Sequence, residues 1–347
     1  MSEQQYKKLI SGQWKGPVAA GLKLLLRFCA AAYGVGTTVR NALFDRGVKK
    51  VHRVPVPVIS IGNLTTGGTG KTPIVAWFVQ ELQKQGQKPG IISRGYRADE
   101  TGVNDEKRVL DRLCPRVPHE QDPDRVRAAE KLIREQQVTC LVLDDAFQHR
   151  RIDRQLDVVL IDASNPFGFD ALLPAGLLRE PPKSLCRADV VLITRSDTAT
   201  HSQLQAIQEE IRSVGCEAEV FQTCFEATEL LDGDNNRTEM KAVRNKRVCV
   251  MTGIGNPEAF ITTCQSEGAI VVAEKIFPDH YHYRPTDLIE IQKQATQKNC
   301  DAILTTLKDL VKIHQSVDKL KAVLINTRFI DPLSEEALGR KIRQIFQ

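Results

Sequence analysis

A glycine-rich segment, residues 62–72, sets the strongest limit on how this chain can fold. It reads Gly-Asn-Leu-Thr-Thr-Gly-Gly-Thr-Gly-Lys-Thr. It follows an apolar run at residues 54–61, expected to be a strand, and precedes residues 72–85, whose apolar positions repeat at helical spacing. This order predicts a phosphate-binding P-loop, because the glycines let backbone N–H groups turn towards phosphate oxygens at the amino end of a helix.

The side chains of this loop have expected roles. Lys71 is expected to reach the β and γ phosphates and to act in catalysis, and the Thr72 hydroxyl to ligate Mg²⁺. Thr65 stands where the strict pattern has glycine. The residues expected to bind the nucleotide are Thr65, Thr66, Gly67, Gly68, Thr69, Gly70, Lys71 and Thr72.

Beyond the P-loop, a pair of acidic residues follows another apolar run. Residues 138–143 are expected to form a strand, and Asp144 and Asp145 come directly after it. A P-loop protein needs a carboxylate near its metal, at the end of a neighbouring strand. We therefore expect Asp144 and Asp145 to take part in Mg²⁺ binding, one holding the metal and the other positioning a ligand; an Asp pair that only caps a turn is the alternative.

Short apolar runs alternate with helical stretches, which predicts an α/β protein with a P-loop NTPase-type parallel sheet core. The stretch at residues 226–246 is polar and rich in turn residues, and a second alternation follows it. We therefore expect a P-loop core at residues 49–225, a linker at 226–246, and a second, smaller α/β domain at 247–347.

The amino-terminal segment, residues 1–48, is expected to be a basic amphipathic helix. The chain has a net charge of +5, but its first 60 residues contain ten Lys or Arg against two acids. Leu22, Leu25 and Cys29 recur at helical spacing, with Lys23 and Arg27 on another face. Such a helix suits an anionic membrane surface, although a helix packed on the domain with a solvated basic face has the same pattern.

This segment is not expected to cross the bilayer or to be a signal peptide. Its longest uncharged run, residues 28–39, has 12 residues, whereas a membrane span needs about 20 apolar residues. Its charges lie inside the apolar stretch and no small-residue cleavage site is evident. The protein is therefore expected to stay in the cytoplasm, on the membrane surface.

Two further segments imitate nucleotide-binding motifs only weakly. Residues 194–197, Thr-Arg-Ser-Asp, lack the residues with which Asn-Lys-x-Asp reads guanine. Residues 253–258 follow an expected strand but lack the third glycine of a dinucleotide fingerprint. Neither segment is therefore expected to bind a nucleotide base. Residues 253–258 are better interpreted as a plain turn between a strand and a helix.

The chain resembles the tetraacyldisaccharide 4'-kinase family of lipid A biosynthesis. The matching segments occur in the family's order from about residue 20 to 312. They are residues 57–63 with the P-loop, Ser-Arg-Gly-Tyr at 93–96, Asp-Asp-Ala-Phe-Gln-His at 144–149, Leu-Pro-Ala-Gly-Leu-Leu-Arg-Glu-Pro at 173–181, Gly-Ile-Gly-Asn-Pro at 253–257, Phe-Pro-Asp-His at 277–280, and Lys308-Asp309.

The resemblance implies an ATP-dependent kinase that uses Mg²⁺ and phosphorylates the 4'-hydroxyl of a tetraacylated glucosamine disaccharide 1-phosphate. The partners implied are this lipid A precursor and the anionic surface of the inner membrane, on its cytoplasmic face, with no nucleic acid. Arg179 and Glu180 are expected to contact the substrate. The resemblance also makes the amino-terminal helix a membrane-associating one.

The family's catalytic Asp and His fall on Asp105 and His280. Asn104 and Lys107 stand where the family has Gly and Pro, and Tyr281 where many members have a second His. With this departure, Glu106 is an alternative to Asp105. The pair would lie in different expected domains and would be assembled when these close.

Two other functions use a similar loop. A membrane-linked ATPase switch has a signature lysine at the position of Thr66, and this lysine is absent. A soluble metabolite kinase or synthetase on the same scaffold would differ in its acceptor.

Overall fold

The computed structural model describes residues 3–95, 103–279 and 281–347. The chain forms two compact units. The first contains Met1–Arg94, Val117–Cys224 and Arg328–Gln347, and the second contains Gly95–Arg116 and Phe225–Thr327. These bounds differ from the expected ones. Residues 95–116 leave the P-loop unit, and the last residues of the chain return to it. Residues 1–48 and 226–246, expected as separate segments, belong to the first and the second unit.

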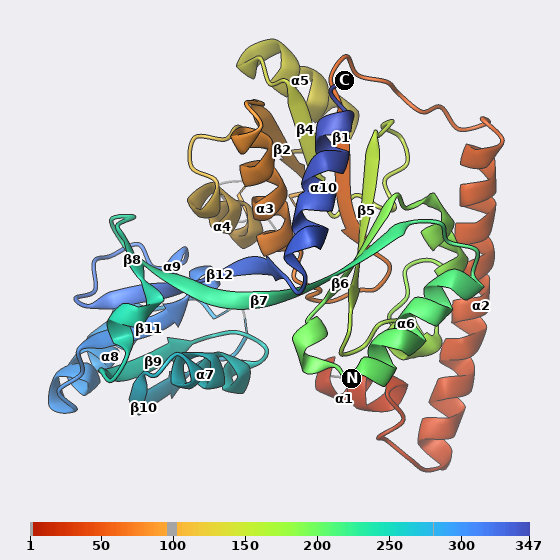
Figure 1. The fold of residues 1–347 in the computed structure, drawn as a ribbon. Helices are drawn as coiled ribbons and strands as arrows, with labels where there is room; N and C mark the ends of the chain where they lie inside the picture. The colour runs from red at the N-terminus through yellow and green to blue at the C-terminus, as the bar shows by residue number, and fades with distance from the viewer. Residues whose placement is uncertain (1–2, 96–102, 280) are drawn as a thin grey trace. The chain divides into compact units, whose positions relative to one another are not determined.

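The first unit is built on a parallel sheet, which agrees with the expected fold class. Its strands are ordered β7, β6, β5, β1, β4, β2, β3 (Figure 1). Neighbours pair in parallel, with Ile61 of β1 beside Asp144 of β4. The strands are β1 (Val58–Asn63), β2 (Pro89–Ser93), β3 (His119–Gln121), β4 (Cys140–Asp144), β5 (Leu156–Asp162), β6 (Val190–Thr194) and β7 (Glu219–Asp232).

The central strands are buried along their whole length, so helices must cover both faces of this sheet. These helices are α3 (Lys71–Lys84), α5 (Arg125–Gln136), α6 (His201–Ser213) and α10 (Pro332–Gln344). The returning carboxyl-terminal segment is fixed to α3, because Trp77 packs against Phe329 at 5.0 Å between ring centroids and donates to Glu335 at 3.1 Å. This packing explains why the last residues belong to the first unit.

The second unit is a smaller α/β structure. Strands β9 (Arg247–Thr252), β10 (Ile270–Ile276), β11 (Ala302–Thr306) and β12 (Leu320–Phe329) pair in parallel in the order β10, β9, β11, β12. Its helices are α4 (Asp105–Leu113), α7 (Pro257–Ser266), α8 (Pro285–Gln297) and α9 (Leu307–Leu310).

The segment expected to be a linker, residues 226–246, is not an open loop. It contains the second half of β7 and the strand β8 (Arg237–Glu239), which pairs with β7 in the antiparallel direction. The polar residues at 232–236 form the turn of this hairpin, where the Asp232 side chain accepts from the backbone N–H groups of Asp234 and Asn236. Turn composition alone does not distinguish a hairpin from a domain boundary.

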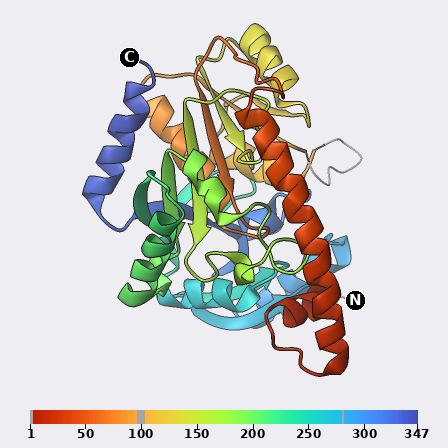
Figure 2. The same ribbon diagram turned by 90° about the vertical axis from the view of Figure 1, so that its right-hand side faces the viewer.

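Helix α2 (Pro17–Asp45) follows the short helix α1 (Glu3–Ile10) and lies along the outside of the first unit (Figure 2). By length and composition it could cross a membrane, which differs from the expectation drawn from its uncharged run. Its buried residues, Ala19, Ala30 and Thr37, share one face. Gly34 on this helix allows a close approach, since an added Cβ would lie 2.9 Å from Leu172 Cδ1.

Candidate active site

The P-loop connects the carboxyl end of β1 to the amino end of α3, as expected. Gly67 and Gly70 have φ values of 124° and 83°, a region that side-chain-bearing residues rarely adopt. Gly62 is needed for a different reason, because an added Cβ would lie 2.6 Å from the backbone nitrogen of Phe147. The loop therefore turns tightly against the segment that follows β4.

One side of the P-loop pairs with residues 177–179. Thr65 forms an isolated antiparallel bridge with Leu178, and the Thr66 backbone N–H donates to the carbonyl oxygen of Leu177 at 2.8 Å. The backbone at Thr65 is thus extended, a conformation that any residue adopts. Glycine is therefore not required at the position where the strict pattern has it.

The other side of the P-loop is held by the Thr-Arg-Ser-Asp segment after β6. The Thr194 hydroxyl donates to the carbonyl oxygen of Thr69 at 3.0 Å, and Arg195 Nη2 donates to that of Gly68 at 3.0 Å. Arg195 also forms an ion pair with Asp162 at the end of β5. Sequence reasoning assigned this segment no function, and the structure gives it a supporting one.

Lys71 and Asp145 face each other at the P-loop. Lys71 Nζ lies 3.5 Å from Asp145 Oδ1, and Arg179 Nη1 lies 2.9 Å from Asp145 Oδ2. Burial acts to raise the pKa of Asp145, but Lys71 and Arg179 outweigh it and hold the pKa below its ordinary value. Asp145 is therefore ionised at neutral pH and orients the lysine.

The residues expected to hold Mg²⁺ fit a hard cation. Asp144 ends β4 beside Ile61 of β1, the strand that leads into the P-loop, and Thr72 is the second residue of α3. A hydroxyl and carboxylate oxygens are the ligand types that Mg²⁺ prefers, with phosphate oxygens completing its shell. Within residues 3–95, 103–279 and 281–347, no group of three His, Cys, Asp or Glu residues could hold a metal alone.

Glu180 does not have the environment of a substrate contact. Its side chain is 0% exposed and forms ion pairs with Arg40 of α2 and with Arg187, the latter at 2.6 Å. The expected substrate role is therefore replaced by a structural one. Because Tyr33 of α2 also donates to the carbonyl oxygen of Arg179 at 2.9 Å, residues 179 and 180 connect α2 to the carboxylate that faces Lys71.

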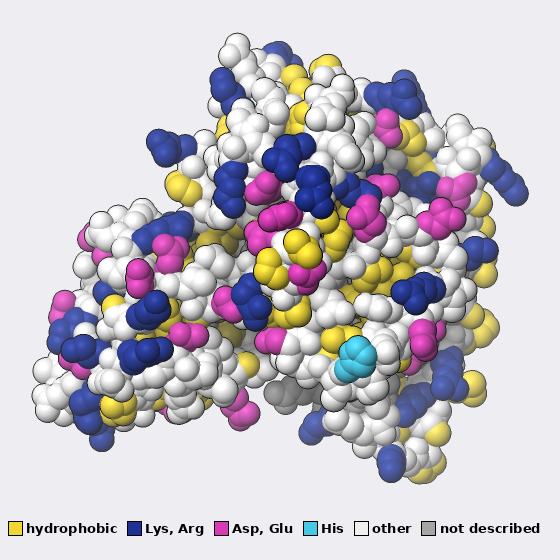
Figure 3. Space-filling view, in the orientation of Figure 1, with side chains coloured by type: hydrophobic (Ala, Val, Ile, Leu, Met, Phe, Trp, Pro, Cys, Tyr) yellow, Lys and Arg dark blue, Asp and Glu magenta, His cyan; other side chains and the backbone are white. Residues whose placement is uncertain are grey.

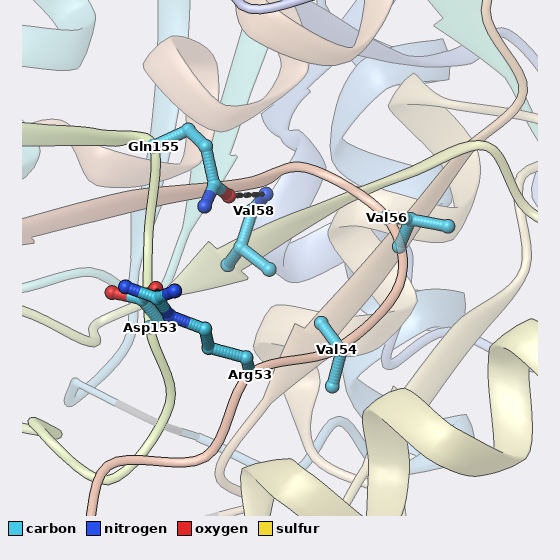
Figure 4. A pocket seen from close by; sticks show the side chains of 6 residues that line it. All are labelled: Arg53, Val54, Val56, Val58, Asp153 and Gln155. Carbon is cyan, nitrogen blue, oxygen red and sulfur yellow. Dashed lines mark hydrogen bonds and ion pairs between the residues drawn. The ribbon is translucent and has the colours of Figure 1, made fainter.

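A separate cavity in the first unit plays no part in this arrangement. It has a volume of about 280 Å³ and is lined by Arg53, Val54, Val56, Val58, Asp153 and Gln155 (Figure 4). Val58 is the first residue of β1, whereas the P-loop follows its last residue. The cavity thus lies at the opposite end of this strand from the phosphate-binding loop.

Asp105 is the first residue of α4, in the second unit. Asn104 caps this helix by accepting from the Lys107 backbone N–H at 2.9 Å, so the departure from the family's glycine has a local structural reason. The Asp105 side chain is 31% exposed, and its Oδ2 lies 3.6 Å from Lys312 Nζ. The Glu106 side chain is exposed.

His280 lies outside the described residues, so the structure describes no contact of this side chain. Asp105 belongs to the second unit. The expectation that places Asp105 in the P-loop core is therefore corrected, whereas the pairing of Asp105 with His280 stays a prediction.

The structure brings three of the family segments together in the second unit. An added Cβ at Gly253 would lie 3.0 Å from the Tyr283 hydroxyl, 3.2 Å from the Pro278 carbonyl oxygen and 3.4 Å from Asp309 Oδ1. The Gly-Ile-Gly-Asn-Pro segment is thus a turn that packs on the segments around Pro278 and Asp309. It is not a dinucleotide fingerprint. Tyr281, which replaces a histidine of the family pattern, donates to Asp287 at 3.1 Å.

Comparisons with known proteins agree on one family. Residues 22–347 match the family model of tetraacyldisaccharide-1-P 4'-kinase. The tetraacyldisaccharide 4'-kinase of Anaeromyxobacter dehalogenans (strain 2CP-C) is 34% identical over 337 residues, which cover 91% of this chain and 89% of the relative. That of Chlorobaculum parvum is 37% identical over 311 residues, with 83% and 84% covered.

A solved structure agrees with these matches. The crystal structure of LpxK from Aquifex aeolicus in complex with ATP superposes with a TM-score of 0.77 at 27% identity, covering 94% of this chain and 100% of that one.

Proposed function

This chain belongs to the family of tetraacyldisaccharide 4'-kinases, and we propose which of its residues carry out phosphoryl transfer and which contact the membrane that holds the lipid. The chain is an ATP-dependent lipid A 4'-kinase: it transfers the γ-phosphoryl group of ATP to the 4'-hydroxyl of a tetraacylated disaccharide 1-phosphate. The observation that carries this assignment is the family match from residue 22 to residue 347. Its direct test is phosphoryl transfer to that disaccharide.

In the proposed site, residues 65–72 bind the phosphates of ATP and Lys71 stabilises charge that develops on the γ-phosphoryl group. Asp145 holds the lysine in place at 3.5 Å, and Arg179 in turn fixes Asp145 at 2.9 Å. Thr72 and Asp144, with Asp145, would hold Mg²⁺, which neutralises phosphate charge when bound. Arg179 therefore acts at the phosphate site in this proposal and does not bind the sugar.

Asp105 is the proposed general base. A sugar hydroxyl is a poor nucleophile, and a carboxylate oriented by a histidine can accept its proton as the γ-phosphoryl group leaves ADP. The partial exposure of Asp105 and its position at the start of α4 support this role. The role of His280 rests on the Asp-His motif of the resemblance.

We assign membrane contact to the outer face of α2. Its exposed large aliphatic and phenylalanine side chains occupy an arc of about 120° when successive residues are placed about 100° apart, on the side opposite the buried Ala19, Ala30 and Thr37. Figure 3 shows hydrophobic side chains among Lys and Arg along its right-hand edge, where α2 runs in Figure 1. The residues in this arc are Val18, Leu24, Leu25, Phe28, Val35 and Val39.

An acylated, anionic substrate requires an enzyme that works at the lipid surface, and this face of α2 meets that need. The contacts of Tyr33 and Arg40 with residues 179 and 180 hold the helix along the first unit. These contacts favour peripheral attachment of α2 to the cytoplasmic face of the inner membrane and argue against a helix that spans this membrane.

Replacing Leu24 and Phe28 together with aspartate is expected to lower binding to anionic vesicles at least about tenfold, because each buried apolar side chain contributes about 1.5–3 kcal/mol. Both side chains are more than 70% exposed, so folding should be unaffected. Binding is measured by sedimentation with phosphatidylglycerol vesicles. Point substitutions are preferred to truncation at residue 40, which would leave the buried Glu180 without Arg40.

Leu333→Asp is the matched control, because Leu333 is 70% exposed but lies on α10. It should bind vesicles as the unchanged protein does, and higher salt should weaken binding of both through screening. Unchanged binding of the Leu24 and Phe28 variant would exclude this face as the membrane contact. Resistance of the bound protein to carbonate extraction would favour a spanning helix.

A further inference from the structure

Asp309 is a buried carboxylate to which the reaction has so far assigned no role. It lies in the short helix α9, is 0% exposed, and belongs to one of the segments shared with the family. Its Oδ2 accepts from Thr252 Oγ1 at 3.0 Å, Thr306 Oγ1 at 2.7 Å and the Gly253 backbone N–H at 3.2 Å. Three donors on one oxygen hold this carboxylate rigidly at the ends of β9 and β11.

The phenol of Tyr283 packs at the same place. Burial, reinforced by the nearby Asp309 carboxylate, raises the pKa of Tyr283, so the phenol stays neutral. Because a phenol is either neutral or negative, the tyrosine cannot balance the charge of the buried carboxylate.

Lys312 supplies this charge and also faces Asp105. Its side chain is 6% exposed, and its ammonium nitrogen lies 3.9 Å from Asp309 Oδ1 and 3.6 Å from Asp105 Oδ2. A turn holds its backbone, since the Lys312 N–H donates to the carbonyl oxygen of Asp309 at 3.0 Å. One nearly buried ammonium thus lies between a fully buried carboxylate and a partly exposed one.

The two carboxylates differ in what they can do. Asp309 is closed to solvent and bound by fixed donors, so it can only anchor the ammonium. Asp105 is 31% exposed at the first position of α4, where a reacting hydroxyl could reach it. Asp309 therefore fixes the Lys312 ammonium, and the ammonium in turn fixes Asp105.

We infer that Lys312 is a positioning residue for phosphoryl transfer: anchored by Asp309, its ammonium fixes the Oδ2 side of Asp105 and so orients the carboxylate that accepts the sugar proton. The inference rests on the proposed role of Asp105 as the base. An ion pair that only docks α4 on the unit would show the same distances, so the test must separate orientation from stability.

The experiment is a double-mutant cycle between Lys312→Met and Asp105→Ala, with kcat, KM for the disaccharide and ATP affinity measured for each variant. We expect Lys312→Met to lower kcat about tenfold or more, because misplacement of a reacting group is costly, while ATP affinity stays unchanged. In the Asp105→Ala background the same change should cost less than about twofold, because the residue it orients is gone. Lys312→Arg should restore most of the lost kcat.

Arg237→Met is the control, since Arg237 forms an ion pair with Glu229 at 3.0 Å in the same unit, on the β7–β8 hairpin. Its kcat should be unchanged. If Lys312→Met is unfolded by circular dichroism, Lys312→Gln replaces it in the same cycle.

Equal losses of kcat in both backgrounds, or no loss in either, would overturn the positioning role. A fully active Asp105→Ala variant would instead overturn the proposed base. The cycle therefore distinguishes failure of this inference from failure of the function on which it rests.

Discussion

Replacing Lys71 by alanine is expected to lower kcat at least about 100-fold, the scale lost when a preorganised electrostatic contact to the transition state is removed. The P-loop directs Lys71 to the phosphates, and Asp145, itself fixed by Arg179, orients the ammonium, so no other side chain of α3 can replace it. The measurement is steady-state transfer of labelled γ-phosphate at saturating ATP.

Lys84→Ala is the matched control for this prediction. Lys84 is at the other end of α3, is 67% exposed and pairs with Glu81, so its loss should leave kcat unchanged. Turnover of the Lys71→Ala variant within a few fold of the unchanged enzyme would contradict the assignment of residues 62–72 as the phosphate site.

The second large effect concerns the proposed base. Asp105→Ala and His280→Ala should each abolish most phosphoryl transfer while ATP binding is retained, and the double variant should lose little more than the more damaging single one. This non-additivity is expected because an acceptor of the proton and the histidine that orients it act as one unit. The measurement is kcat for the three variants, with nucleotide affinity determined separately.

Two results would redirect this assignment. If the single losses multiply in the double variant, Asp105 and His280 act independently. If Asp105→Ala is fully active and Glu106→Ala is inactive, the base is the neighbouring carboxylate, which is also in the first turn of α4.

The core of the fold could be predicted from the sequence because its signals are local. The P-loop, the buried strands beside it and the acidic pair after β4 each carry their own pattern, and the structure puts them next to one another in parallel register. The second alternation of apolar runs and helical stretches, expected after residue 246, is likewise observed as α7, α8, β9 and β11.

Pairings between distant segments could not be predicted in this way. Nothing near Glu180 in the sequence indicates that it is buried between Arg40 and Arg187, and this burial removes it from the substrate. Residues 95–116 were expected in the P-loop core, but their helix α4 packs on α9, some 200 residues later. No sequence motif marks Lys312, because its proposed role depends only on the two carboxylates, Asp105 and Asp309, that the fold places beside it.

The most direct test of the central claim is the fate of the γ-phosphate of labelled ATP, with and without a tetraacylated glucosamine disaccharide 1-phosphate dispersed in detergent. The account predicts that label appears on the lipid at the 4' position, that this requires Mg²⁺, and that release of inorganic phosphate without the lipid is slow by comparison. Rapid ATP hydrolysis that is independent of the lipid, with no label on the disaccharide, would contradict the account and favour a membrane-linked ATPase.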